Sequence, residues 1–474
     1  MKQSNSRWAV NLTALVLAAG LLIGLFTGCF QLGSSKPQPN KPGLFETDGN
    51  GIITGYTCDK TDLPKALVIP AKIGNEVITG IRNNAFYDCK GLTSLDLSAC
   101  TSLTVIGVEA DTYLRMGAFG GCTGLTEVKL PASLTKIDNS AFRDCTGLTS
   151  IDLSGCTSLT EIDGFSGCTG LTEVKLPASL IEIDGFSGCT GLTSVDLSGC
   201  TSLTKIEEYA FSGCTGLTEV KLPASLTEIG KLAFRGCTRL TSIDLSACTS
   251  LTKIGREAFS GCTGLTEVKL PASLTGIGEL AFHGCTSLTS IDLSGCTNLT
   301  EIGTMAFEGC TGLASIDLSA CTSLTEIGER AFKDCSKLTG TIVFPASLKT
   351  IKTHNYNNYP DNFVGAFEGC IKLQGADFSA CTNFTKIENS TFKNCWRLTE
   401  VKLPASLTEI GKEAFKDCVN LTSAVFADKN VWKVYNNYDY SGTPTPISSS
   451  DLDNAATAAE YLRQTYVYKF WKKN

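Results

Sequence analysis

The segment Cys262–Gly284 reads CTGLTEVKLPASLTGIGELAFHG, and close copies of it recur from about residue 80 to residue 427. Cysteines that follow a Phe-x-x pattern mark the period: most are 23 or 25 residues apart, with single intervals of 21, 33 and 35. A unit this short cannot bury its apolar side chains alone and must stack on its neighbours, so the pattern predicts a solenoid of about fourteen coils. The marking cysteines are Cys89, Cys122, Cys145, Cys168, Cys189, Cys214, Cys237, Cys262, Cys285, Cys310, Cys335, Cys370, Cys395 and Cys418.

Two forms of the unit alternate along much of the chain. One reads LTEVKLPASLTEIG, as at Leu217–Gly230, and the other reads LTSIDLSGCTNLTEIG, as at Leu288–Gly303. The alternation in EVKL and SIDL places aliphatic side chains inward and charged or hydroxyl side chains outward, which predicts a short parallel strand. The following LTEIG and AF segments should close the coil in a turn or short helical piece, because Gly230 and Gly255 interrupt any longer periodicity. Phe is expected to fill the core of every coil.

The pattern AFxxCxxLxxVxLPxSLxxIG over residues 81–427 resembles the BspA-like class of bacterial surface leucine-rich repeats. The resemblance implies a leucine-rich repeat solenoid, an α/β-type repeat architecture built mostly from short parallel strands and turns. It also implies binding to a protein ligand, such as a host matrix protein or a protein on another bacterium. The family brings no catalytic residues and no cofactor, so we expect no enzyme activity.

The N-terminal residues predict export and attachment to a membrane. Basic Lys2 and Arg7 precede an apolar run of 15 residues from Leu12 to Phe26, shorter than the roughly 20 residues that span a bilayer. The small residues before Cys29 resemble a bacterial lipobox, which predicts a lipoprotein signal peptide over residues 1–28 and a lipid on Cys29. An uncleaved anchor or a plain secretion signal is the alternative. Residues 29–44 are rich in Pro, Ser and Gln and should form a flexible tether.

Both ends of the array should carry caps. Residues 45–80 contain Asp-Gly and Asn-Gly pairs between apolar runs, which predicts a hairpin in an N-terminal cap. Asp48 and Asn50 weakly resemble the start of a calcium loop, but the later glutamate is missing and a turn is favoured. In residues 428–474 we expect a strand near 431–434 and a helix over about 454–463, with Asp453 or Asn454 as N-cap. Five aromatic residues there should cover the last coil, an aromatic binding tail being the alternative: Trp432, Tyr461, Tyr466, Phe470 and Trp471.

The chain has 23 cysteines, which in an exported protein would suggest disulfides. Besides the fourteen marking cysteines, seven follow Asp-x-Ser-x or its Phe variant, and Cys29 and Cys58 complete the count. Equivalent cysteines in adjacent coils would point in parallel, which is poor geometry for a disulfide. We therefore expect columns of free, buried thiols that contact backbone carbonyls of the neighbouring coil. The cysteines are at least 11 residues apart and the two histidines are isolated, so no metal site is expected.

The outward strand residues should form a column of alternating charge, and the net charge of −7 gives no reason to expect nucleic acid. Alternating signs remove a repulsion that a uniform column would accumulate, so the column is first of all a stabilising device. Its alternative role is a repetitive binding surface, for which Glu219, Lys221, Glu267 and Lys269 are candidates. The alternation lapses after Asp292. The column runs Asp96, Lys129, Asp152, Lys175, Asp196, Lys221, Asp244, Lys269, Asp292, Asp317.

Two coils carry insertions on the same side, near residues 108–116 and 352–364. The second, KTHNYNNYPDNFV, has the Tyr- and Asn-rich composition of recognition loops, so Tyr356, Tyr359 and Phe363 are candidate anchors. Tyr113 and Met116 are candidates in the first insertion. Tolerated variation in a surface loop is the alternative.

Together these features predict a lipid-anchored protein of the bacterial cell envelope, in the outer membrane and facing the exterior. The leading hypothesis is adhesion to host extracellular-matrix proteins or to other bacterial cells through the solenoid. The alternative is a structural or scaffold lipoprotein of the envelope with no external ligand.

Overall fold

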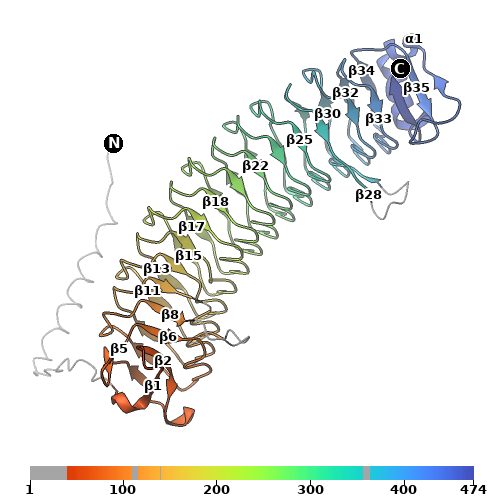
Figure 1. The fold of residues 1–474 in the computed structure, drawn as a ribbon. Helices are drawn as coiled ribbons and strands as arrows, with labels where there is room; N and C mark the ends of the chain where they lie inside the picture. The colour runs from red at the N-terminus through yellow and green to blue at the C-terminus, as the bar shows by residue number, and fades with distance from the viewer. Residues whose placement is uncertain (1–39, 109–115, 139, 356–362, 474) are drawn as a thin grey trace, which may run out of the picture. The chain divides into compact units, whose positions relative to one another are not determined.

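Stacked coils, each with two short parallel strands, make up the fold of the computed structural model (Figure 1). The structure describes residues 40–108, 116–138, 140–355 and 363–473. All of these lie in the unit Pro39–Asn474. The predicted leucine-rich repeat solenoid of about fourteen coils is confirmed, and helix is nearly confined to the C-terminal end.

In most coils the first strand is the predicted EVK or SID segment, and its central aliphatic residue points inward. These strands pair in parallel within five separate sheets, of order β3-β7-β9, β11-β13, β15-β17, β19-β21-β23 and β26-β30-β32-β34. Residues 315–317 form no strand although they match the pattern. The strands are β3 (Ala66–Val68), β7 (Ser94–Asp96), β9 (Glu127–Lys129), β11 (Ser150–Asp152), β13 (Glu173–Lys175), β15 (Ser194–Asp196), β17 (Glu219–Lys221), β19 (Ser242–Asp244), β21 (Glu267–Lys269), β23 (Ser290–Asp292), β26 (Thr341–Val343), β30 (Gly375–Asp377), β32 (Glu400–Leu403) and β34 (Ser423–Phe426).

A second strand in each coil was not predicted: the LTEIG segment was expected to be a turn or a short helical piece, and this expectation is wrong. Up to residue 351 its Glu-Ile or equivalent pair forms a strand in a continuous 14-stranded sheet that also includes cap strands β1 (Phe45–Thr47) and β2 (Ile52–Tyr56), whereas the pairs of the last two coils lie in a separate five-stranded sheet. Two residues suffice because the neighbouring coils supply their hydrogen-bond partners. The AF segments are turns, as predicted. The coil strands of this sheet are β6 (Gly80–Arg82), β8 (Val105–Val108), β10 (Lys136–Ile137), β12 (Glu161–Ile162), β14 (Glu182–Ile183), β16 (Lys205–Ile206), β18 (Glu228–Ile229), β20 (Lys253–Ile254), β22 (Gly276–Ile277), β24 (Glu301–Ile302), β25 (Glu326–Ile327) and β27 (Thr350–Ile351).

A stack of phenylalanine rings runs through the core, one ring from each coil. Consecutive ring centroids are 5.0–5.6 Å apart and the interplanar angles are 2–16°. The rings are buried, which confirms the predicted role of Phe. Near-parallel rings at this separation gain stacking energy beyond the area that they bury. The stack consists of Phe86, Phe119, Phe142, Phe165, Phe186, Phe211, Phe234, Phe259, Phe282, Phe307, Phe332, Phe367, Phe392 and Phe415.

The cysteines that follow these phenylalanines form a buried column, as predicted. From Cys122 to Cys418, each Sγ–H donates to the carbonyl oxygen of the stacked Phe in the preceding coil, at 3.1–3.3 Å. Every cysteine that the structure describes is a free thiol, and all but Cys58 are buried. Burial raises the pKa of Cys262 to about 12, so such thiols stay protonated and unreactive.

The N-terminal cap contains the predicted hairpin, formed by β1 (Phe45–Thr47) and β2 (Ile52–Tyr56). In its turn, Asp48 Oδ1 accepts hydrogen bonds from the backbone N–H groups of Asn50 and Ile52, at 2.9 and 3.1 Å. β2 also pairs in parallel with β6, and the Tyr56 ring stacks on Phe86 at 5.7 Å. The cap therefore extends both the sheet and the ring stack. It further includes η1 (Pro42–Leu44), η2 (Lys60–Asp62) and a hairpin of β4 (Lys72–Ile73) and β5 (Glu76–Val77).

The C-terminal cap contains the predicted strand, β35 (Trp432–Tyr435), and the predicted helix, α2 (Ala455–Glu460). Asn454 is the N-cap, because its Oδ1 accepts from the N–H groups of Ala456 and Thr457. Not predicted was β37 (Phe470–Lys473), which pairs antiparallel with β35 and β33 and buries Trp471 against the last coil. The remaining elements are β31 (Lys386–Ile387), β33 (Glu409–Ile410), β36 (Thr445–Pro446), α1 (Ser449–Asp453) and the π-helical turn η4 (Tyr461–Thr465).

The five cap aromatics predicted to cover the last coil pack on the core or are buried in it. This placement favours a cap over an aromatic binding tail. Within the described ranges no helix is both long enough and apolar enough to span a bilayer.

Candidate functional site

The insertions leave the solenoid at equivalent points, directly after β8 and after β27. The base of the second insertion is an antiparallel pair of β28 (His354–Asn355) and β29 (Phe363–Val364), so Phe363 lies in a strand and is half-buried. Met116 is half-buried, and its N–H donates to Asn84 Oδ1 at 3.1 Å. Tyr113, Tyr356, Tyr359 and Cys29 lie outside the described residues.

The charged candidates on the regular strand face are exposed but paired with one another. Lys221 Nζ lies 3.8 Å from carboxylate oxygens of both Asp196 and Glu219. Lys269 Nζ lies 3.5 Å from Asp244 and 4.0 Å from Glu267. Each lysine is thus compensated within the column, as expected of a stabilising device, and the regular face presents little net charge to a partner.

A polar hollow of about 580 Å³ interrupts the strand face near its C-terminal end, over β26, β30 and β32. Gly375 is in register with Thr341 on one side and Glu400 on the other. Gly375 is buried, and a Cβ there would lie 2.3 Å from Thr341 Oγ1, so the Thr341 side chain occupies the space beside it. We call this the C-terminal hollow, and its lining residues are Thr341, Gln374, Arg397, Thr399, Glu400, Asn420 and Thr422.

Several polar groups of the C-terminal hollow are not engaged in the fold. Within the part of the chain that the structure describes, the side chains of Gln374 and Arg397 make no hydrogen bond or ion pair. Glu400 lies 3.9 Å from Lys402 Nζ, and that lysine pairs more closely with Asp377, at 3.1 Å. Amide, guanidinium and carboxylate groups are therefore available to a ligand.

Three cations extend from the hollow along successive coils. Lys337, Lys372 and Arg397 each occupy the second position after a marking cysteine, where most other coils have Gly. All three are exposed, and among the described residues none forms an ion pair. Neighbouring coils are about 4.8 Å apart, so this cationic column accumulates like charge that the regular column avoids.

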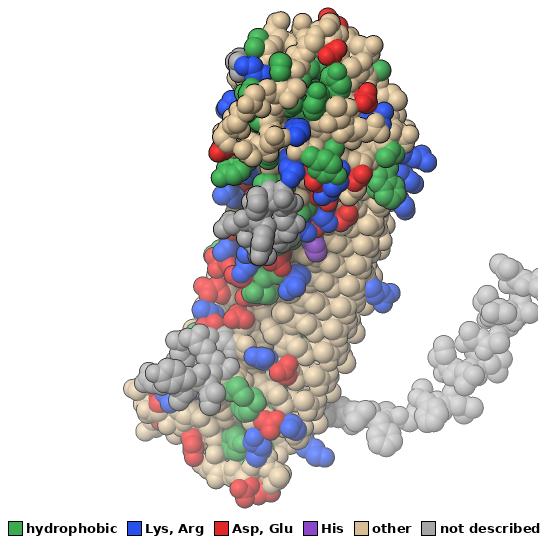
Figure 2. Space-filling view, turned by 90° about the vertical axis from the view of Figure 1, so that its right-hand side faces the viewer, with side chains coloured by type: hydrophobic (Ala, Val, Ile, Leu, Met, Phe, Trp, Pro, Cys, Tyr) green, Lys and Arg blue, Asp and Glu red, His purple; other side chains and the backbone are tan. Residues whose placement is uncertain are grey.

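Apolar side chains lie beside the cationic column, at the first position after Cys370, Cys395 and Cys418. Ile371, Trp396 and Val419 stand where most other coils have Thr. Trp396 is 51% exposed and Val419 is 63% exposed, and Val343 and Val425 are exposed on β26 and β34. On the side shown in Figure 2, a broad tan area runs along the stack, and green, blue and red side chains lie towards both of its ends.

Sequence reasoning missed these residues. The strand face was predicted to become irregular after Asp292, but the candidate binding residues were taken from the strands and the insertions. They could have been found as substitutions within coils of normal length, where CWRL at residues 395–398 and CVNL at residues 418–421 replace the usual CTGL.

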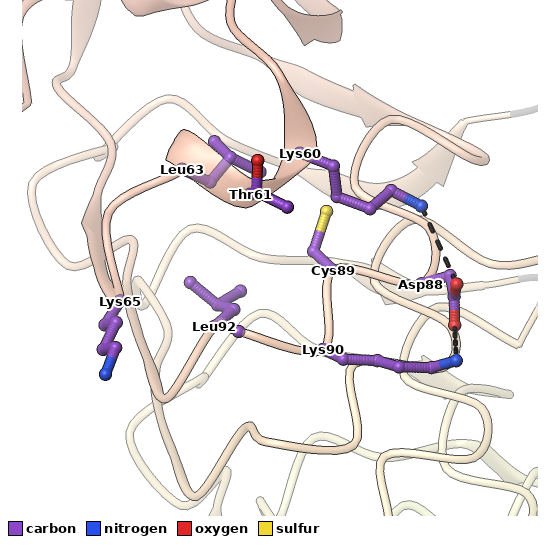
Figure 3. A pocket seen from close by; sticks show the side chains of 9 residues that line it. Lys60, Thr61, Leu63, Lys65, Asp88, Cys89, Lys90 and Leu92 are labelled. Atoms are coloured by element: carbon purple, nitrogen blue, oxygen red, sulfur yellow. Dashed lines mark ion pairs between the residues drawn. The ribbon is translucent and has the colours of Figure 1, made fainter.

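A second cavity, of about 410 Å³, lies in the N-terminal cap and is lined by Lys60, Lys65, Asp88, Cys89 and Lys90, among others (Figure 3). Lys90 and Lys60 pair with Asp88 at 3.0 and 3.8 Å, so two of its three cations are compensated. The neighbouring Cys122 side chain, together with Tyr56 and Lys60, lowers the pKa of Cys89 to about 7 against the opposing effect of burial. Within the described ranges no three potential metal ligands come together here or elsewhere.

Stacked coils with short parallel strands and a core of repeated Leu, Phe and Cys define a leucine-rich repeat solenoid. The chain matches the model of the BspA type leucine-rich repeat region, in six copies, over residues 70–112, 79–201, 181–251, 246–361 and 364–442. It belongs to this family. Leucine-rich repeat proteins typically bind other proteins.

Solved structures of similar proteins come from several bacteria. A leucine-rich repeat protein of Bacteroides ovatus is 23% identical with a TM-score of 0.45, covering 80% of this chain and 91% of its own. A leucine-rich cell surface protein of Faecalibacterium prausnitzii is 23% identical with a TM-score of 0.42, covering 81% and 92%. The pneumococcal vaccine antigen PcpA is 17% identical with a TM-score of 0.42, covering 75% and 78%. No curated protein matches the chain significantly.

Proposed function

We propose that this protein is displayed on the bacterial surface and adheres to host extracellular-matrix proteins or to other bacterial cells through the C-terminal part of its strand face. The observation that carries the proposal is the break in a charge-compensated surface. Among the described residues Arg397, which lines the C-terminal hollow, forms no ion pair, and neither do Lys372 and Lys337; Trp396, next to Arg397 in the chain, is exposed. Exposed Trp and Arg are the residue types that dominate binding energy in protein interfaces.

Display on the surface rests on the N-terminal sequence. The predicted signal peptide over residues 1–28, the lipid on Cys29 and the tether over residues 29–44 would hold the solenoid at the outer membrane, facing the exterior. The family supports a role in binding rather than catalysis.

The test is binding of the full chain, held in mild detergent, to a panel of immobilised matrix proteins and whole bacterial cells. The variant Trp396→Thr/Val419→Thr restores the repeat's usual residue at both positions and should fold normally. We expect saturable binding by the natural chain and at least a tenfold loss in the variant, because interface anchors contribute about 2 kcal/mol or more. The matched control, Thr238→Ala/Thr263→Ala, changes the same position in two regular coils and should bind normally.

Two further variants divide the alternatives. If deletion of residues 352–364 abolishes binding while Trp396→Thr/Val419→Thr does not, the second insertion and its candidates Tyr356, Tyr359 and Phe363 carry the ligand. If no matrix protein or cell type binds, the structural envelope role replaces adhesion.

Cys29→Ser should release the protein from the membrane fraction, and protease treatment of intact cells should degrade the natural chain if it faces the exterior.

A further inference from the structure

We infer that the C-terminal hollow and the cationic column form a binding site for a linear anionic glycan that bears carboxylate or sulfate groups. The inference rests on the proposed adhesive function and names the class of ligand that this site would bind.

Charge is the first argument. The strand residues elsewhere pair each lysine with a carboxylate of the same or an adjacent coil, as Lys175 does with Asp152 at 3.7 Å and with Glu173 at 3.8 Å. The cationic column and the charged residues of the neighbouring strands β30 and β32 together carry four cations and two carboxylates, a net charge of +2. These residues are Lys337, Lys372, Arg397, Lys402, Asp377 and Glu400. Like charges stacked without compensation destabilise the fold, so an anionic ligand is the partner that complements them.

The spacing of the cations is the second argument. Lys337, Lys372 and Arg397 repeat once per coil, at intervals of about 4.8 Å. The Sγ–H groups of Cys370 and Cys395 bond these coils at equivalent positions, so the three cations follow one another from coil to coil. A linear polymer with regularly repeated anions can contact all three cations at once, whereas a single small anion reaches only one or two.

The lining of the hollow favours a sugar over a peptide. Gln374 offers an amide, Thr341 a hydroxyl and Glu400 a carboxylate, all suited to sugar hydroxyl groups, whereas Asn420 Nδ2 donates to the Trp396 carbonyl oxygen at 2.6 Å. β30 and β32 are each paired on both sides, so neither of these two strands has a free edge to which a peptide strand could add. Trp396 provides an exposed indole face at the adjoining position, on which a pyranose ring can stack.

Nucleic acid fits the site less well. The unpaired column has only three cations and a single neighbouring Trp, and the chain as a whole carries a net charge of −7. Nucleic-acid sites combine longer basic stripes with several aromatic side chains.

The experiment is calorimetric titration of the full chain in mild detergent, at 50 and 200 mM salt, with four probes of equal length. The probes are a heparin decasaccharide, a hyaluronan decasaccharide, a neutral dextran decasaccharide and a decamer of glutamate. We expect binding of the two anionic glycans and no binding of dextran or of the glutamate peptide. Affinity for heparin should fall roughly as the second or third power of salt concentration, since about three cations displace its counterions.

Variants then locate the site. Lys337→Gln/Lys372→Gln/Arg397→Gln should abolish the salt dependence and weaken binding more than thirtyfold, because each cation removed reduces the salt slope by about one. Lys175→Gln/Lys221→Gln/Lys269→Gln removes the same charge from the regular face and should leave binding unchanged. Trp396→Ala should weaken binding about tenfold.

Equal losses in both charge variants would overturn the inference, because binding would then reflect general charge. Preferential binding of the glutamate decamer, or of a dT decamer added as a further probe, would assign the site to a peptide or to nucleic acid instead. If the chain adheres to cells or matrix proteins but binds neither anionic glycan, the proposed function stands and the glycan inference fails. If it binds nothing in either experiment, both fail.

Discussion

At the scale of single residues, the most unusual side chains are those that depart from the repeat. Asp138, Asp163, Asp184 and Glu207 replace a glycine that follows the second strand in later coils. Burial, with Asp163, Glu207 and Glu208 nearby, raises the pKa of Asp184 to about 6, against the opposing hydrogen bond from the Gly185 N–H. The charged form of this carboxylate therefore destabilises the folded protein at neutral pH.

Asp184→Asn should stabilise the protein at pH 7.5 and leave it unchanged at pH 3. The folded protein holds this proton more tightly than the unfolded chain between about pH 4 and pH 6, so the free energy of unfolding falls as the pH rises through this window. Since Asp184 is only half-buried, we expect a gain of about 1 kcal/mol, measured from urea unfolding curves at both pH values. Asp196→Asn is the control with opposite sign, because hydrogen bonds from Ser198 lower the pKa of Asp196. A stabilising effect of both substitutions would contradict the assignment.

Cys89 should be alkylated faster than any other marking cysteine in the native protein. Its Sγ lines the cavity in the N-terminal cap (Figure 3), and its pKa is lowered to about 7, whereas burial raises the pKa of Cys189 to about 12. Iodoacetamide at pH 8 followed by peptide mass spectrometry measures the order, with half-exposed Cys58 as the reference for an accessible thiol. Labelling of Cys89 no faster than of Cys189 would show that the cavity gives no access to its sulfur.

At the scale of elements, the ring stack is the interaction that every coil contributes to its neighbours. Phe259 is fully buried, with Phe234 and Phe282 each at 5.3 Å. Phe259→Ala should lower the free energy of unfolding by about 3–5 kcal/mol, because it leaves a cavity in the middle of the stack. Urea unfolding measures the loss, and Thr263→Ala, on the surface of the next coil, should change stability by less than about 0.5 kcal/mol. A loss below 1 kcal/mol for Phe259→Ala would mean that the coils hold together chiefly through their sheets.

The sequence predicted those elements whose signal repeats in every unit. Phe and Cys recur at fixed spacing, so their burial followed from the period alone. The strands of the 14-stranded sheet were missed because two residues, such as Glu228 and Ile229, are too few to show an alternation. Their strand geometry depends on hydrogen bonds from adjacent coils.

The C-terminal hollow could not be predicted for a different reason. It is lined by residues of several coils, from Thr341 to Thr422, whose juxtaposition becomes visible only once the register of β26, β30 and β32 is known. Trp396 and Arg397 could have been noticed as departures from the repeat, but their exposure and lack of partners required the structure. The lipid anchor, the tether and the tips of both insertions remain sequence predictions.

At the scale of the whole molecule, alternating charge lets a long parallel array avoid electrostatic repulsion. Lys175→Glu/Lys221→Glu/Lys269→Glu would convert the middle of the column to one sign, opposite Asp152, Asp196 and Asp244. We expect a loss of about 1–3 kcal/mol at low salt, because each exposed pair contributes roughly 0.2–1 kcal/mol and repulsion is added. Unfolding followed at 20 and 500 mM salt measures the effect, most of which should disappear at high salt. The corresponding Lys→Gln variant should lose less stability, and its stability should depend little on salt. A loss of stability in the Glu variant that does not depend on salt would contradict the argument.

The continuous 14-stranded sheet has a mechanical consequence. Its hydrogen bonds run along the stack, so a pull between the two ends of the solenoid loads them in tension and separates one coil from the next. Each released coil of 23 or 25 residues adds roughly 80 Å of extended chain. Under a stretching force the protein should therefore extend in a series of nearly equal steps, and each step should absorb mechanical work.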